Sequence, residues 1–232
     1  MNELSPSYFF DLNEFQHAKI FENCTYPWEA LSNISTYLEA YDLGNIEVDI
    51  PEGVHLVNPE LISIGKGTVI EPTAYIKGPC IIGKNSSIRH GAYIRGNVVT
   101  GDQCVIGHAT EVKNAIFLNK AQAAHFAYVG DCILGNQVNL GAGTKCANLK
   151  LDNQSIVVQF QGKKISTGLR KFAAILGDNV QLGCNSVTNP GTLLGKRVLC
   201  YPCTTFGGFI PSDHTIRPSH KAEISETSKA LK

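Results

Sequence analysis

The stretch "ISIGKGTVIEPTAYIKGPCIIGKNSSIRHGAYI", residues 62–94, decides the fold, because from Ile64 onward an isoleucine returns at every sixth position. A period of six does not fit the 3.6-residue turn of an α-helix, whereas it is a multiple of the two-residue period of a β-strand. Hexapeptide periodicity of this kind is typical of a β-helix, in which short strands turn corners and stack as a parallel solenoid. The sequence therefore predicts an all-β solenoid.

The six-residue period continues well beyond this stretch. It runs from Ile64 to Ala124 with one polar exception, Thr100, and a small residue usually stands four positions after each anchor. The phase slips at Gly130, resumes at Leu134 and Leu140, and returns after an interruption from Leu176 to Phe206. These anchors are predicted to point inward, where each buried isoleucine contributes roughly 1.5–3 kcal/mol.

The segments outside the repeats suggest three further parts. Residues 1–45 are expected to form a helical cap for the open end of the solenoid, since Trp28, Leu31, Ile34, Leu38 and Tyr41 share one face at helical spacing. The β-helix is expected over 46–211, with a hairpin-like excursion at 149–173 that breaks the period. Residues 212–232 are expected to form a polar tail.

Composition excludes several classes of function. The chain of 232 residues has 20 basic and 20 acidic side chains, and this neutral balance gives no reason to expect nucleic acid or an anionic membrane as partner. No apolar run is long enough to span a bilayer, and the N-terminus does not resemble a signal peptide, so we expect a cytoplasmic location. Cys80, Cys104 and Cys200 fall on inward positions, so we expect packing rather than a metal or disulfides.

The histidine in "AHFAYVGD", residues 124–131, is the first candidate for chemistry. His125 follows the predicted inward anchor Ala124, so its ring is expected on the outer wall. With an ordinary pKa near about 6.5, a histidine can serve as a general base at neutral pH.

The segment "AHFAYVGDCILGNQVNLGAGTKCANLKLD", residues 124–152, closely resembles the amino-sugar-1-phosphate acetyltransferase module. That module forms the C-terminal half of bifunctional N-acetylglucosamine-1-phosphate uridyltransferases and occurs in related archaeal sugar-phosphate nucleotidylyltransferases. The resemblance covers about residues 89–211. It implies the left-handed form of the parallel β-helix, with His125 as the catalytic base.

The resemblance also implies a set of binding residues. Matching positions for substrate binding are Arg95, Lys113, Tyr128, Asn139 and Asn148, with Lys171 next to Arg170 as in the archaeal relatives. The coenzyme A arm is expected along later coils near Cys184 and Pro202, with Lys196 and Arg197 as candidates for its phosphates. Leu149 replaces the tyrosine of the bacterial enzymes, and "LKLDNQ" lacks their downstream lysine, so the sugar pocket is expected to differ from the bacterial one.

The activity implied is transfer of acetyl from acetyl-CoA to the amine of an amino-sugar 1-phosphate such as glucosamine 1-phosphate, a step of cell-envelope biosynthesis. His125 would accept the amine proton, backbone N–H groups of "NLGAGT" (139–144) would hold the oxyanion, and no metal is required. The family builds its sites between subunits, so a homotrimer is expected. Residues 1–45 are too short for a nucleotidyltransferase domain and contain no G-x-G-x-x-G, so we expect no such activity in this chain.

Three alternatives stay open on the sequence. A lipid A type acyltransferase would use acyl carrier protein as donor and would also carry an outward histidine. A γ-type carbonic anhydrase would bind zinc with three histidines, but the chain lacks the H-x4-H pair, although His90 and His108 stand one coil apart. A non-catalytic assembly or regulatory subunit is the third.

Overall fold

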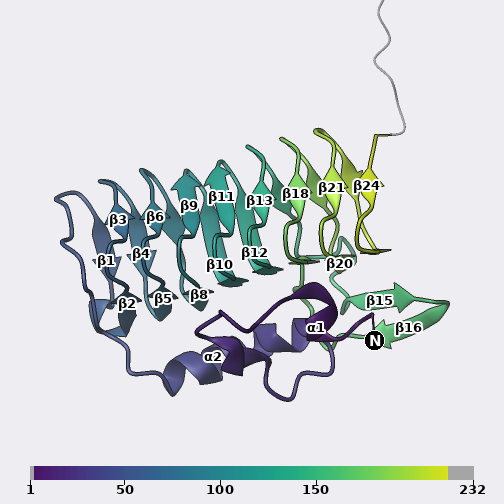
Figure 1. Ribbon diagram of the computed structural model, residues 1–232, viewed down its shortest axis with the longest axis horizontal. Coiled ribbons are helices and arrows are strands. Elements are labelled where there is room, and N and C mark those ends of the chain that lie inside the picture. Colours follow the sequence, from purple (N-terminus) through teal and green to yellow (C-terminus); the bar gives the residue numbers. More distant parts are fainter. Residues whose placement is uncertain (1–2, 219–232) are drawn as a thin grey trace, which may run out of the picture.

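The computed structural model describes residues 3–218 and shows a parallel β-helix with three faces. Equivalent residues of successive coils pair in register, as Ile64 does with Ile82 and Ile88 with Ile106. Strands are only two to seven residues long because the chain turns a corner after each of them. The predicted class, a left-handed parallel β-helix with a small helical N-terminal segment, is confirmed (Figure 1).

Each face is one ladder of parallel strands. Face I is an eight-stranded sheet made of β3 (Val69–Ile70), β6 (Ser87–Ile88), β9 (Val105–His108), β11 (Gln122–His125), β13 (Asn139–Leu140), β18 (Gln181–Leu182), β21 (Leu199–Cys200) and β24 (Thr215–Ile216). Face II contains β1 (His55–Val57), β4 (Tyr75–Lys77), β7 (Tyr93–Ile94), β10 (Glu111–Phe117), β12 (Tyr128–Leu134), β14 (Lys145–Cys146), β19 (Val187–Thr188) and β22 (Thr205–Phe206). Face III contains β2 (Ile62–Ile64), β5 (Cys80–Ile82), β8 (Val98–Thr100), the ends of β10 and β12, β17 (Ala174–Leu176), β20 (Thr192–Leu194) and β23 (Phe209–Ile210).

The core follows the hexapeptide pattern except where the coil length changes. Thr100 pairs with Phe117, which is a step of 17 residues instead of the 18 that separate Ile88 from Ile106. The phase therefore slips after Val112, well before Gly130, where the sequence pattern had placed it. As a result Phe117 and Ala123 fill the core positions that Leu118 and Ala124 were predicted to take.

The predicted packing role of the cysteines is confirmed. Cys80 and Cys104 are almost fully buried in the core, and Cys200 is 6% exposed. All eight cysteines are free thiols. Burial raises the pKa of the Cys80 and Cys104 thiols to about 12, so both stay protonated and act as small apolar side chains.

The N-terminal segment lies along face III (Figure 1). It contains two helices, α1 (Pro6–Phe9) and α2 (Ala30–Glu39), and two 3-10 turns, η1 (Ala18–Phe21) and η2 (Pro27–Glu29). A third 3-10 turn, η3 (Pro59–Leu61), lies in the β-helix just before β2. Trp28, Leu31, Ile34 and Leu38 are buried as predicted. They pack on the outward isoleucines of face III, such as Ile116 and Ile133, so the segment covers a side of the prism rather than its open end.

The excursion and the C-terminal end also take definite positions. Strands β15 (Val157–Phe160) and β16 (Lys163–Ser166) form the antiparallel hairpin expected within 149–173. At the other end, β24 pairs with β21, so the ladder runs beyond Pro211 to Ile216. The last coil has 16 residues, since Leu194 pairs with Ile210, and this shorter step breaks the six-residue pattern. Most of the expected tail, 219–232, lies outside the described residues.

Candidate active site

His125 lies on the corner between faces I and II, at the end of β11. Its side chain is exposed, as predicted, but the inward residue that sets this direction is Ala123 rather than Ala124. Backbone pairing places His125 directly beside His108, and the His108 ring stacks on that of His90 at 5.2 Å. We call this set of corner positions, His90, His108, His125, Ala142, Cys184 and Pro202, the histidine corner.

A second set of polar residues gathers around one buried carboxylate at the corner between faces II and III. Asp131 is only 4% exposed and accepts hydrogen bonds from Lys113 Nζ at 2.7 Å, Asn148 Nδ2 at 2.5 Å and Asn114 Nδ2 at 2.9 Å. Asn148 Nδ2 also lies 3.1 Å from the Tyr128 hydroxyl. Three of the residues implied by the resemblance, Lys113, Tyr128 and Asn148, therefore meet here, and we call the set the Asp131 cluster.

The Asp131 cluster was only partly visible in the sequence. Asp131 belongs to the G-D pair that follows Tyr128, and Asn114 follows Lys113, but neither was singled out as a site residue. The length of the coils identifies both residues, because Asn114, Asp131 and Asn148 stand 17 residues apart in the sequence. With 17-residue coils the three residues align on one corner. Burial, followed by the negative charge of Asp131, raises the pKa of the Tyr128 hydroxyl, which therefore remains a proton donor.

Arg95 stands on face II, close to this cluster. Its guanidinium donates a hydrogen bond of 2.6 Å to Glu111, which raises the pKa of Arg95 further above its usual range. The pair is partly open to solvent, with side chains 43% and 34% exposed. A surface pair of this kind holds its partners weakly and can exchange a carboxylate for another anion.

The structure separates other predicted substrate residues from the cluster. Asn139 lies on face I, paired with Gln122 and Gln181, and does not join Lys113 and Tyr128. Lys171 pairs through its backbone with Leu149, directly after Asn148, and its side chain is exposed. Within one subunit, Asn139 therefore faces a different side of the prism from the Asp131 cluster.

The glycine-rich turn after β13 offers fewer oxyanion donors than its sequence suggests. The N–H groups of Gly141, Gly143 and Thr144 donate to backbone carbonyls of Leu182, His125 and Gly141, respectively. Among the described hydrogen bonds, the N–H of Ala142 has no acceptor. Ala142 follows His125 by one coil on the histidine corner, so this N–H lies on the same corner as the candidate base.

The residues expected to bind coenzyme A fall on two different corners. Cys184 and Pro202 are exposed on the histidine corner, in coils beyond His125. Lys196 and Arg197 lie instead at the corner between faces III and I. There Lys196 pairs with Asp178 at 3.5 Å and Arg197 with Asp213 at 2.6 Å. The structure therefore does not bring Lys196 and Arg197 together with Cys184 and Pro202 within one subunit.

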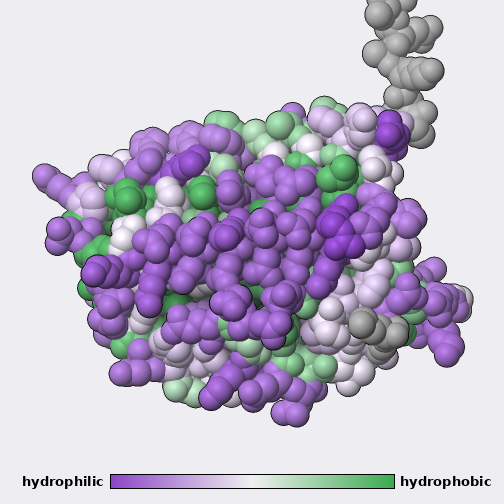
Figure 2. All heavy atoms as spheres, viewed as in Figure 1, coloured by the Kyte–Doolittle hydropathy of each residue, from purple (hydrophilic) through white to green (hydrophobic). Residues whose placement is uncertain are grey.

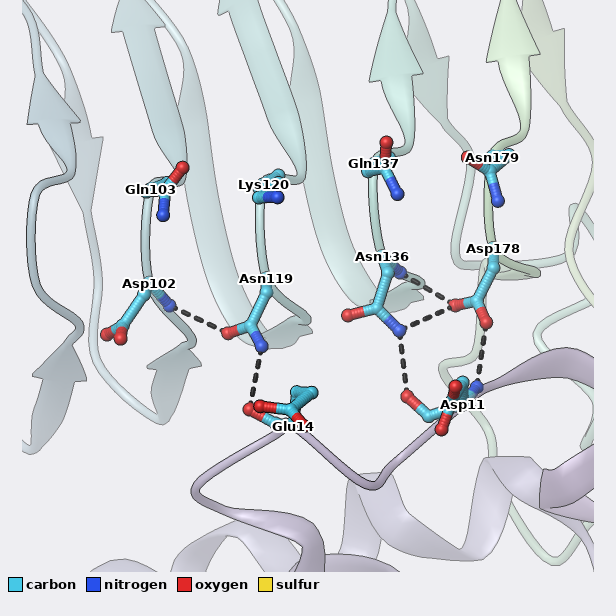
Figure 3. A pocket seen from close by; sticks show the side chains of 10 residues that line it. All are labelled: Asp11, Glu14, Asp102, Gln103, Asn119, Lys120, Asn136, Gln137, Asp178 and Asn179. Carbon is cyan, nitrogen blue, oxygen red and sulfur yellow. Dashed lines mark hydrogen bonds between the residues drawn. The ribbon is translucent and has the colours of Figure 1, made fainter.

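A polar cavity of about 470 Å³ lies at this third corner, under the N-terminal segment (Figure 3). Its polar groups bind one another. Asp178 accepts from the N–H of Asp11 at 2.7 Å, while Asn136 and Asn119 donate to the carbonyls of Asp11 and Glu14. These bonds attach the N-terminal segment to the prism and explain the cavity, which contains none of the predicted site residues. The space-filling view shows a band of hydrophilic side chains across the same side of the molecule (Figure 2).

Two further features of the described residues bear on the type of site. Within residues 3–218, no three His, Cys, Asp or Glu side chains are grouped as a metal site would need, even though His125 adds a third member to the histidine corner. Over the same residues, every helix is too short or too polar to cross a membrane.

Comparisons with known proteins agree with the resemblance found in the sequence. The family model described as the GMPPB C-terminal domain matches residues 76–200. The bifunctional protein GlmU of Methanococcus aeolicus is 34% identical over 172 residues, which are 73% of this chain and 40% of that protein. The bifunctional sugar-1-phosphate nucleotidylyltransferase/acetyltransferase of Sulfurisphaera tokodaii is 38% identical over 94 residues, 40% of this chain and 23% of the relative.

The chain therefore spans at most about two fifths of the length of these curated relatives. Among solved structures, the polySia-specific acetyltransferase NeuO aligns with 78% of this chain and 92% of its own, at 11% identity and a TM-score of 0.34. An overlap this loose adds nothing to the assignment of a site.

Proposed function

Because the chain belongs to the family of the GMPPB C-terminal domain, we propose that it is an acetyltransferase that uses acetyl-CoA and an amino-sugar 1-phosphate such as glucosamine 1-phosphate. The observation that carries the proposal is the exposed His125 on a corner of the prism, with the Asp131 cluster on the neighbouring face. The similar protein of Sulfurisphaera tokodaii is named a sugar-1-phosphate nucleotidylyltransferase/acetyltransferase, which supports the same class of reaction.

The reaction needs a base and an oxyanion donor. The amine nitrogen of the acceptor bonds to the thioester carbonyl carbon, and His125 takes the proton that the nitrogen must lose. The N–H of Ala142 donates to the oxygen that becomes negative in the tetrahedral intermediate. When the C–S bond breaks, His125 returns the proton to the sulfur, so acetylated amine and free coenzyme A leave the site.

The Asp131 cluster orients the acceptor in this proposal. Asp131 holds Lys113 and Asn148 in place, and Tyr128 keeps its proton for a hydrogen bond with a sugar hydroxyl. Fixed partners of this kind reduce the entropy lost when two substrates are brought together. Lys171 and Asn139 are further substrate residues. Cys184 and Pro202 line the path of the coenzyme A arm, and Lys196 and Arg197 remain candidates for its phosphates.

We further propose a homotrimer in the cytoplasm. The N-terminal segment covers face III, which leaves faces I and II, and the histidine corner between them, open for contact with other subunits. Such contact would bring Asn139 of one face and the Asp131 cluster of another subunit to a shared cleft. It would also supply the Lys196–Arg197 corner to a site that one subunit alone does not complete.

The proposal is tested by the release of free thiol from acetyl-CoA in the presence of glucosamine 1-phosphate. The variant His125→Ala should lose roughly 10²–10⁴-fold in kcat, the usual contribution of a general base. His214→Ala, which removes another exposed histidine in the last coils, should keep the wild-type rate. Equal rates for His125→Ala and the wild type would refute the role of His125, and an inactive wild type would refute the proposed reaction.

A further inference from the structure

A second cavity, of about 470 Å³, lies between the N-terminal segment and the first coils of the prism. Tyr41 and Asp42, which follow α2, border it from the segment, and Ser63 of β2 and Ile81 of β5 border it from face III. It meets the polar cavity of Figure 3 at Asp102, which borders both. Among the described residues around this second cavity, none belongs to the candidate acetyltransferase site, so the cavity calls for an explanation of its own.

Ser63 interrupts an otherwise apolar row on the outer side of face III. The register of the strands continues from Ser63 to Ile81, Val99 and Ile116, and these three pack under the N-terminal segment. Ser63 is 8% exposed, and its buried Oγ has no hydrogen-bond partner among the described residues. Thr188 has the only other such oxygen in the described part of the chain, and it lies between core residues of neighbouring coils. Since a serine side chain turns between staggered rotamers, a molecule in the cavity can supply the partner that Ser63 lacks.

His17 brings a second unpaired polar group to the cavity. Its ring is 2% exposed, and Nδ1 lies 2.8 Å from the Tyr37 hydroxyl. Burial lowers the pKa of His17 to about 4 and raises the pKa of Tyr37 to about 12, so at neutral pH the imidazole is uncharged and the phenol keeps its proton. The phenol is the stronger donor and gives its hydrogen bond to Nδ1, which leaves the imidazole proton on Nε2. No described residue accepts a hydrogen bond from this Nε2–H.

The charged residues around the cavity favour a cation. Asp42, Glu47 and Asp102 border it, and Lys84 is the one ammonium among the described residues that do so. Backbone N–H groups hold Glu47 at 3.2 Å and Asp102 at 2.7 Å, whereas Asp42 is exposed and has no partner in the described part of the chain. Three carboxylates against one ammonium attract a small cation and repel molecules that carry phosphate.

From these features we propose that the cavity binds a small hydroxylated amine, namely an amino sugar without phosphate. Its ammonium group lies against Asp42 and Asp102, as a charge-assisted hydrogen bond requires. Its hydroxyls, which donate and accept, pair with Ser63 Oγ and with the Nε2–H of His17. A polyamine has no acceptor for that N–H, so the hydroxyls decide the class of ligand. Ile81 offers an apolar surface to the C–H face of the ring, and the volume lies within the range of about 300–1,000 Å³ that is usual for small-molecule sites.

The first test is titration calorimetry of the full chain with glucosamine, with N-acetylglucosamine as the uncharged control. The wild type should bind glucosamine at least about tenfold more tightly, because the acetylated sugar has no ammonium group for the carboxylates. Asp42→Asn should weaken glucosamine binding by about tenfold, and Ser63→Ala by about two- to tenfold. The controls Asp49→Asn and Ser87→Ala change residues outside the cavity and should bind like the wild type. A wild type that binds no glucosamine, or that binds both sugars equally, would overturn the proposal.

The second test locates the bound sugar by hydrogen–deuterium exchange. Glucosamine should slow exchange around His17 and in β2, because it contacts both the N-terminal segment and face III, and Ser63→Ala should reduce this protection. Protection confined to the Asp131 cluster would place the amine in the candidate active site and would overturn the second site. The proposal is independent of the acetyl transfer, so Ser63→Ala should keep the wild-type kcat and KM. If the wild type transfers no acetyl group but glucosamine protects His17 and β2, the proposed reaction is wrong and this site stands.

Discussion

Replacement of Asp131 by asparagine tests the cluster on which the acceptor site depends. The carboxylate is 4% exposed and neutralises Lys113, whose side chain is only 19% exposed. Removing one partner of a buried ion pair leaves an uncompensated charge and usually costs about 3–5 kcal/mol. Asparagine keeps the shape and tolerates the positive φ of 55° at this position, so backbone strain does not add to the loss. We therefore expect a loss near the lower end, about 3 kcal/mol.

The assay is urea unfolding followed by circular dichroism, with the midpoint compared at unchanged slope. Asp131→Asn should lower the midpoint clearly, and Lys113→Met added to it should recover at least about 1 kcal/mol because the stranded charge is gone. Asp152→Asn is the matched control, since Asp152 forms an ion pair of similar length, 2.8 Å, with Lys150 on the surface, and its midpoint should barely move. If Asp131→Asn behaves like the control, the Asp131 cluster is not the buried network described here.

Three other predictions concern stability and assembly. Burial lowers the pKa of His17 from 6.5 to about 4, so the folded state binds a proton less readily than the unfolded chain. The free energy of unfolding should therefore fall by roughly 3 kcal/mol as pH drops from about 6.5 to about 4. In urea midpoints measured over this pH range, the variant His17→Phe should show a smaller fall than the wild type. Ile88→Asp should unfold the β-helix because it buries a charge at a 1% exposed position, whereas Val69→Asp, at a 61% exposed position one coil away, should leave the circular dichroism spectrum unchanged. Light scattering should give a homotrimer, and a stable monomer at micromolar concentration would count against a site shared between subunits.

The sequence predicted the β-helix well because a buried ladder repeats the same requirement in every coil. Each inward slot must be apolar, so Ile64, Ile82 and Ile88 could be assigned without any tertiary information. The pattern failed where coil length changed, since a 17-residue coil moves the inward slot from Ala124 to Ala123. His125 is exposed all the same, because it stands two positions after Ala123, at the corner where β11 ends.

The site was predicted less completely, for a different physical reason. A sequence motif does not tell on which face or corner of the prism each of its residues lies. Asn139 lies on face I, and Lys196 and Arg197 lie at the corner between faces III and I, all away from the Asp131 cluster. The paired carboxylates were also missed. Glu111 and Asp131 look like ordinary surface acids in the sequence, and only the register between coils places them against Arg95 and Lys113.

The corners explain why one regular scaffold can carry several different polar sites. Backbone pairing fixes the core, while the residue two positions after each inward anchor stands at a corner and takes no part in core packing. Along the prism the histidine corner holds histidines with His125, whereas the corner between faces II and III changes along its length from bare glycines beside Lys77 to asparagines with Asp131. Because neighbouring members of a column are about 4.8 Å apart, side chains from consecutive coils can bind one ligand together. Changes in a column should therefore alter binding and catalysis with little effect on folding, except where a column member is itself buried in an ion pair, as Asp131 is.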